Sequence, residues 1–182
     1  MGEVLAKKGD AVGAEPLFRR ALSIQQSLLD ADNPDIGLTM WNLAEVLRVL
    51  GRCGEAEALV RRTLEIWELG FGPEHEWTAW GLISLSEVRL AQGDAAEASA
   101  GAERAAKILK QLFGTAHAVL GSTLNLHGRA LLAAGRYAES EAVLARALEI
   151  QSALGAEGRA GAEATRALLG ECRAKLAATA PS

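Results

Sequence analysis

The sequence has few of the residues that build disulfide scaffolds, metal centres or catalytic sites. Its 182 residues include only two cysteines and three histidines. Cys53 and Cys172 stand far apart, without the spacing of a metal-binding or redox motif. We therefore expect both cysteines to be free thiols in a reducing compartment.

A basic excess and long apolar runs are absent as well. The net charge is −4, and no cluster of lysine and arginine forms the basic patch that is typical of nucleic-acid-binding proteins. No apolar run reaches the ~18 residues of a membrane span, and the first ten residues lack the apolar core of a secretory signal. We expect a cytoplasmic protein with neither a nucleic-acid nor a membrane partner.

The sequence shows no recognisable catalytic constellation. His75 and His117 fall in loops, where we expect capping or exposed side chains. His127 replaces a leucine in an apolar pattern, which predicts a buried, hydrogen-bonded histidine, with a ligand contact as the alternative. Paired carboxylates such as Glu55 and Glu57 are expected on solvated helix faces, not in a cleft that would perturb them. We predict that the chain is not an enzyme and holds neither metal nor cofactor.

The chain does contain an internal repeat. A glycine returns every 42 residues, at Gly9, Gly51, Gly93 and Gly135. A fixed period of about 20–50 residues is typical of repeat arrays. The same period aligns an isoleucine column at residues 24, 66, 108 and 150, and a small-residue column at residues 14, 56, 98 and 140.

Apolar residues recur at helical steps on both sides of each glycine, so each repeat is predicted to be two helices joined by a glycine turn. We expect A helices over 35–50, 77–92, 119–134 and 161–176, and B helices over 11–29, 53–69, 95–112 and 137–154. The first A helix is expected to be short, over about residues 2–8 only. Asp10 and Asp94 follow their glycines and are expected to cap the next helix.

Three segments, AlaGluProLeuPheArgArgAlaLeuSerIle (14–24), GluAlaGluAlaLeuValArgArgThrLeuGluIle (55–66) and GlyArgTyrAlaGluSerGluAlaValLeuAlaArgAlaLeuGluIle (135–150), resemble tetratricopeptide repeats. The 42-residue unit and the GlyProGluHis loop (72–75) resemble the kinesin-light-chain subtype. The resemblance implies an all-α, right-handed superhelix of about four repeats plus a terminal helix. We expect one array over residues 1–176, with repeats at about 1–33, 34–75, 76–117 and 118–159, a terminal helix over 160–176 and a flexible tail over 177–182.

The resemblance also implies a concave groove lined by A helices, and this groove is the predicted binding site. Trp41 and Trp80 lie in columns that mix apolar with polar residues, so we expect them on the groove as anchors, with packing between repeats as the alternative. Trp67 is expected to be half-exposed on the convex side, and Trp77 to pack between repeats. Further groove candidates are Asn42, Glu45, Arg48, Ile83, Glu87, Asn125, Arg129, Glu171 and Lys175.

Family members that bind chaperone tails hold a terminal carboxylate with Asn and basic residues. Asn42 matches one position of that clamp, but Trp80 and Ser84 stand where basic residues are needed. A peptide with an apolar or aromatic anchor is therefore the expected ligand.

The predicted function is a protein–protein interaction scaffold that binds a peptide or partner protein in the groove. One alternative is a regulatory arm or fragment of a larger bacterial signalling protein, a kinase or a transcriptional regulator. Another is a module that self-associates end to end through the first repeat, where Leu17, Phe18 and Leu22 are expected to form an exposed apolar patch.

The third repeat is predicted to be the weakest. Its B helix carries Gly101 and several alanines where the other B helices have larger residues. Arg89 stands in a column of leucines and is expected to place its guanidinium at the surface, beside Glu97 or Glu103.

Overall fold

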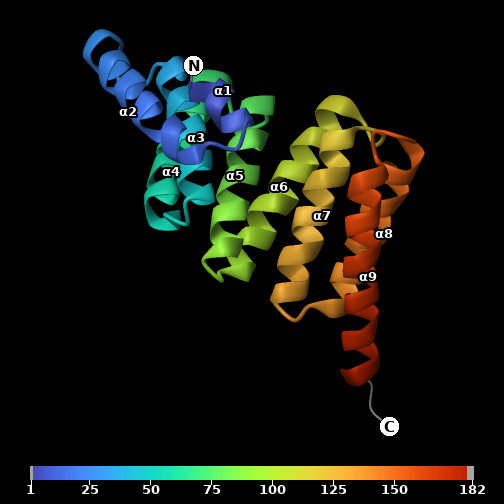
Figure 1. Cartoon of the computed structure of the whole chain (residues 1–182). Coiled ribbons are helices and arrows are strands. Elements are labelled where there is room, and N and C mark those ends of the chain that lie inside the picture. Colours follow the sequence, from blue (N-terminus) through green and yellow to red (C-terminus); the bar gives the residue numbers. More distant parts are fainter. Residues whose placement is uncertain (1, 180–182) are drawn as a thin grey trace. The chain divides into compact units, whose positions relative to one another are not determined.

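The computed structural model describes residues 2–179, and within that range it contains α-helices and connecting turns but no strand (Figure 1). The helices are α1 (Gly2–Lys7), α2 (Ala11–Leu28), α3 (Pro34–Val49), α4 (Cys53–Phe71), α5 (Glu76–Ala91), α6 (Ala95–Phe113), α7 (Ala118–Ala133), α8 (Tyr137–Ala153) and α9 (Arg159–Thr179). The predicted all-α class is confirmed, and the A and B helices begin and end within about two residues of the predicted bounds, except at the end of the terminal helix.

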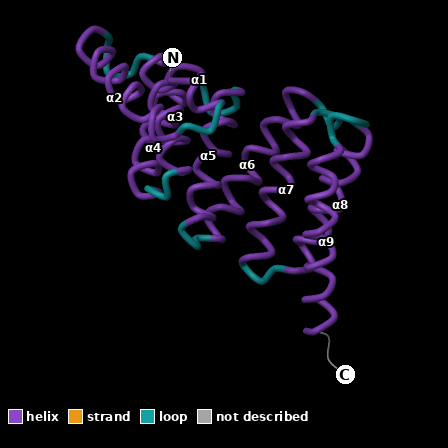
Figure 2. Tube along the Cα trace, in the orientation of Figure 1, coloured by secondary structure: helices purple, strands orange, loops and turns teal. Residues whose placement is uncertain are grey.

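The recurring glycine ends each A helix for a conformational reason. The φ angles of Gly9, Gly51, Gly93 and Gly135 are +81°, +76°, +87° and +74°. A side chain with a Cβ atom is strained in this left-handed region, whereas glycine is not. The turn therefore closes within a few residues, and the B helix folds back along the A helix (Figure 2).

The helices form two compact units, one up to Gln92 and one from Gly93 onward. In the first unit each of the helices α1 to α5 packs on the next, and α3 also contacts α5. In the second unit α6 to α9 pack in the same sequential way, and α7 also contacts α9. Each unit therefore places consecutive A helices side by side, which is the arrangement that the predicted binding surface requires.

The cores of both units follow the columns of the repeat. Ala14, Ala56, Ala98 and Ser140, the small-residue column, are all fully buried. A small side chain at this position lets the two helices of a repeat approach closely. In the isoleucine column, residues 66, 108 and 150 are buried, but Ile24 is 50% exposed.

The exposure of Ile24 follows from the short α1 helix. Six residues in α1 extend about 9 Å, whereas the 18 residues of α2 extend about 27 Å. The expected exposed patch on the first repeat is therefore displaced. Phe18 is buried against α1, only 7% exposed, and Leu17 and Leu22 are half-buried. The large exposed apolar residues of α2 are Val12 near its start and Ile24 and Leu28 at its other end.

Side-chain caps hold several helix starts. Asp10 accepts a hydrogen bond from Gly13 N at 2.8 Å, and Asp94 accepts one from Glu97 N at 3.2 Å, as predicted. In the loop between repeats, His75 Nδ1 accepts from Trp77 N at 3.2 Å. His117 makes no capping hydrogen bond, and its ring stacks on Phe113 with centroids 4.7 Å apart.

One expectation needs correction. The terminal helix does not end at residue 176 but continues to Thr179, because Ala177 and Ala178 favour helix; residues 180–182 of the predicted tail lie outside the described residues. Arg89 exposes part of its side chain, as predicted, and it pairs with Glu57 of α4 at 2.8 Å. Glu57 is within reach because α4 and α5 pack directly on each other.

Candidate functional site

Helices α3 and α5 carry most of the predicted site residues of the first unit on matching faces. Trp41, Glu45 and Arg48 follow one another at steps of four and three residues on α3. Trp80, Ser84 and Glu87 repeat these steps on α5. Residues at such spacing share one face of a helix, and the contacts below show that the two faces meet. We call this set of six residues the A-helix face.

The tryptophans of this unit form a continuous cluster. The ring centroid of Trp41 lies 6.5 Å from that of Trp80 and 6.3 Å from that of Trp67. Trp67 in turn lies 5.2 Å from Trp77. The predicted neighbourhood of Trp41 and Trp80 on adjacent A helices is therefore confirmed.

The position predicted for Trp67 is wrong. Trp67 is 1% exposed and belongs to the core with Ile36, Met40 and Ile66. A helical glycine makes room for its indole, since a Cβ atom at Gly37 of α3 would lie 2.8 Å from Trp67 Nε1. The polar residues Gln25 and Gln151 in the same column suggested exposure, and Gly37 was the signal that could have corrected it.

Trp41 and Trp80 differ in how firmly they are held. Both are half-buried, but Trp41 contacts two other indoles and its Nε1 atom is buried without a hydrogen-bond partner. Trp80 Nε1 donates to Glu76 Oε1 at 3.3 Å, next to solvent. Trp41 is thus part of the core as well as of the face, whereas Trp80 is the more surface-directed of the two.

Beside the indoles, the charged side chains of the A-helix face pair with one another. Arg48 lies 2.9 Å from Glu45 and 3.1 Å from Glu87, and Ser84 Oγ donates a short hydrogen bond to Glu45. Burial acts to lower the pKa of Arg48, but the two carboxylates outweigh it and leave that pKa raised. Arg48 therefore stays charged and bridges α3 to α5.

The remaining candidates have other roles or lie elsewhere. Asn42 Nδ2 donates to Leu38 O within its own helix at 3.0 Å, and Ile83 is half-buried on α5. Asn125, in the second unit, donates to Thr165 Oγ1 at 2.7 Å and so joins α7 to α9. Arg129, Glu171 and Lys175 are exposed on α7 and α9.

Comparison with known proteins assigns the family. A sequence profile described as "Tetratricopeptide repeat" matches residues 1–68, 35–111 and 84–153. The chain belongs to the tetratricopeptide repeat family. No curated protein matches the chain.

Solved structures agree on the type of tetratricopeptide repeat. BtubC (BKLC) from P. vanneervenii is similar with a TM-score of 0.84 and 22% sequence identity, over 97% of this chain and 70% of that one. A putative kinesin light chain from Podosopora anserina with nearly identical TPR-like repeats has a TM-score of 0.76 and 20% identity, over 100% of this chain and 94% of that one. At these identities the likeness shows the fold, a kinesin-light-chain-like tetratricopeptide solenoid, which confirms the predicted class.

The tetratricopeptide repeat fold is typically a non-catalytic scaffold. Among residues 2–179 no three His, Cys, Asp or Glu side chains come together as metal ligands would. None of the helices described is long and apolar enough to cross a membrane. His127 is buried as predicted, 9% exposed, but its imidazole makes no hydrogen bond to another described residue.

Proposed function

We propose that the A-helix face binds a peptide or partner protein through an apolar or aromatic anchor that packs on Trp80 and Trp41. Tetratricopeptide repeats imply a protein–protein interaction scaffold, and the proposal names the surface and the chemistry. The observation that carries it is the contact between these two half-buried indoles on neighbouring A helices. Large aromatics with part of their area exposed are frequent energetic centres of interfaces.

The ion pairs on the same face bear on the type of ligand. Arg48 is already shared by Glu45 and Glu87, and Glu45 also accepts from Ser84. A ligand carboxylate would have to displace these carboxylates from Arg48. The arrangement therefore disfavours recognition of a free C-terminus and favours an anchor that removes apolar area from water at about 25 cal/mol per Å².

The test is a selection from a random peptide library displayed on phage, followed by affinity measurements. Selected peptides are expected to share an aromatic or large aliphatic residue. Trp80→Ala should weaken binding by ~2 kcal/mol, the range of an interface hot spot. Phe113→Ala is the matched control, because Phe113 is an aromatic residue that is 40% exposed on α6, outside α3 and α5.

Thermal unfolding of each variant separates binding from folding. Trp80→Ala should destabilise the fold less than Leu43→Ala, because Leu43 is only 1% exposed. Equal affinity of the selected peptides for wild type and Trp80→Ala would contradict the proposal. So would unfolding of Trp80→Ala, because Trp80 would then be core.

A further inference from the structure

A cavity of about 270 Å³ lies among α6, α7 and α8, within the second unit. We call it the α6–α8 cavity. Leu120, Leu124, Val143 and Ile150 give it an aliphatic wall on α7 and α8. The third repeat departs from the other repeats at several of the remaining lining residues, and each departure bears on what the cavity can hold.

The first departure is a missing leucine. Ala106 of α6 lines the cavity and is 7% exposed. Its column of the repeat holds Leu22, Leu64 and Leu148. Replacing a buried leucine with alanine leaves a space that the surrounding structure fills only in part. The room in the α6–α8 cavity therefore coincides with a side chain that only this repeat lacks.

The second departure is a buried imidazole. His127 lines the cavity where its column otherwise holds Leu43, Leu85 and Leu169. Burial lowers the pKa of His127, so the ring is uncharged at neutral pH and has one nitrogen that donates and one that accepts. Neither bonds another described residue, and a buried polar group without a partner is costly. A ligand group in the cavity would supply that partner.

The third departure is a change in the sign of charge. Lys107 and Lys110 of α6 line the cavity and take the places of Glu65 and Glu68 in the preceding repeat. Lys107 pairs with Glu103 at 2.8 Å, whereas Lys110 has no ion-pair partner among residues 2–179. Lys110 is therefore a cation that an anionic ligand could use.

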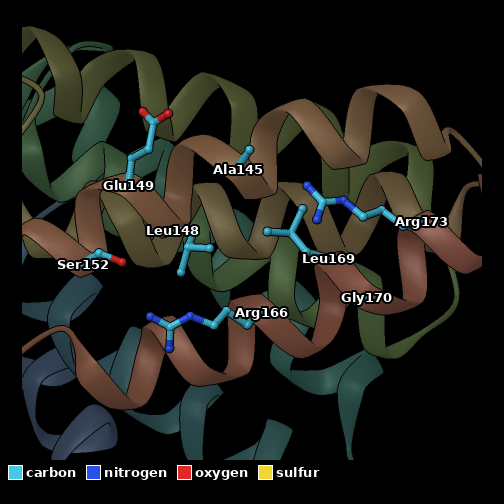
Figure 3. Close-up of a pocket in the computed structure, with 8 residues that line it drawn as sticks. All are labelled: Ala145, Leu148, Glu149, Ser152, Arg166, Leu169, Gly170 and Arg173. Atoms are coloured by element: carbon cyan, nitrogen blue, oxygen red, sulfur yellow. The ribbon is translucent and has the colours of Figure 1, made fainter.

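The following repeat has none of these departures. Figure 3 shows its equivalent positions between α8 and α9, where Leu148 and Leu169 replace Ala106 and His127, and Glu149 and Ser152 replace the two lysines. Packing that all copies share does not explain a space, an imidazole and two cations that occur together in one copy.

The polar groups lie toward different ends of the cavity. Glu103 and Lys110 are seven residues apart on α6, which separates them by about 10 Å along the helix axis. Glu103 acts electrostatically on His127, so the imidazole lies toward the Glu103 end. Thr115, in the loop after α6, lines the Lys110 end. The cavity thus has a hydrogen-bonding end, an aliphatic middle and a cationic end.

We propose that the α6–α8 cavity binds a small hydroxylated organic acid. Its carboxylate pairs with Lys110, its hydroxyl group bonds His127, and its apolar body packs against Leu124 and Val143. A cavity of about 150 Å³ holds benzene, so this one has room for about eleven non-hydrogen atoms. That size fits a small molecule and is too small for a helix of a partner protein. The site is independent of the A-helix face, which lies in the other unit.

Titration of the full chain with two probes tests the proposal. Para-hydroxyphenylpropionate has an aromatic body, and omega-hydroxyoctanoate has an aliphatic one. Nuclear magnetic resonance follows the imidazole Cε1 protons of the three histidines, and the His127 signal is assigned by its loss in His127→Leu. At least one probe should shift the His127 signal saturably. His75, in the first unit, should not respond.

Calorimetry of two variants then tests each end of the cavity. Lys110→Gln should weaken binding of the acid about fivefold, as expected for one exposed ion pair, and should leave binding of the neutral para-hydroxyphenylpropionamide unchanged. His127→Leu should weaken para-hydroxyphenylpropionate about fivefold, through one lost hydrogen bond, but not phenylpropionate, which has no hydroxyl group. Lys8→Gln, at an exposed lysine between α1 and α2, is the matched control and should change neither.

Ala106→Leu restores the side chain that the other repeats carry and should abolish binding in a chain that still unfolds cooperatively on heating. Unchanged binding in this variant would place the acid outside the cavity and overturn the proposal. So would the absence of a His127 shift with both probes, or an equal effect of Lys110→Gln on the acid and its amide. The Lys110→Gln result decides by itself if Ala106→Leu does not fold, because Lys110 is exposed.

Discussion

Gly128 and Gly170 occupy equivalent positions in consecutive A helices, yet the structure predicts opposite effects of replacing them with alanine. Both lie inside helices, α7 and α9. A Cβ atom at Gly128 would be 2.5 Å from both Cγ and Cδ2 of Leu144, whose side chain is fully buried. A Cβ atom at Gly170 would meet nothing within 4 Å.

The magnitudes follow from two competing terms. Alanine is more favourable than glycine in a helix interior by about 1 kcal/mol. Gly170→Ala should therefore raise the free energy of unfolding by about 0.5–1 kcal/mol. Gly128→Ala has the same gain, but it must displace the branched carbon of Leu144, and overpacking of this kind costs about 1–3 kcal/mol. The net effect at Gly128 is a loss of ~1 kcal/mol, which reverses the usual ranking of the two residues.

An earlier repeat supplies the compensating change. The positions equivalent to Gly128 and Leu144 are Ala44 and Val60, both fully buried. One methylene group has moved from one helix to the other, so the summed volume is conserved. Leu144→Val alone should destabilise by about 1 kcal/mol, and Gly128→Ala with Leu144→Val should recover most of the loss from either single change.

Urea unfolding followed by circular dichroism measures all four variants, and both glycines lie in the same compact unit. The double variant then gives the coupling energy between residues 128 and 144, which should be of the order of 1 kcal/mol and stabilising. If Gly128→Ala is as stable as wild type, or if the two substitutions are additive, α7 and α8 do not approach as closely as described.

Three further predictions concern the core. Ala56→Leu should lower the free energy of unfolding by about 1–3 kcal/mol, because Ala56 is fully buried, whereas Ala58→Leu on the exposed side of α4 should change it by less than about 0.5 kcal/mol. Burial lowers the pKa of His127 below 6.5, so the unfolded chain binds the proton more readily and stability should fall as the pH drops below about 6.5; in His127→Leu this part of the pH dependence, at most ~1.4 kcal/mol per pH unit, should be absent from urea unfolding at pH 7.5 and 5.5. Helix α6 buries mostly alanines where α4 buries Val60, Leu64 and Trp67, so α6 should exchange amide hydrogens faster than α4, and equal protection would show that closer helix approach compensates.

Columns of the repeat were enough to predict the helices and most of the core. A position that must be small recurs as Ala14, Ala56, Ala98 and Ser140, and all four are fully buried. The sequence could not show how far the partner helix extends, so it placed the exposed apolar patch at Phe18 and not at Ile24. That difference depends on the length of α1. The ends of a helix are determined by contacts that the periodicity of the sequence does not reveal.

The candidate site could be predicted in part. Spacing alone brought Trp41 to Trp80, because neighbouring A helices share one orientation. It also placed Glu45 and Arg48 on one face of α3, because residues three apart share a helix face. The hydrogen bond from Ser84 to Glu45 and the ion pair between Arg48 and Glu87 join side chains on two helices. Their formation depends on the relative offset of α3 and α5, which the column alignment does not give. Trp67 was misplaced for a related reason, because the space for its ring is made by Gly37 on another helix.

Residues that differ from their equivalents in the other repeats give the most direct indication of a binding role. A residue that repeats in every copy is explained by the packing that every copy shares. Trp41 is not explained in this way, because the equivalent residues in other repeats differ. It adds aromatic area to a face that is polar at the equivalent residue Asn125. This change weakens the case for a purely structural role and strengthens the case for a partner, since a half-buried indole is stabilised by a contact from another molecule.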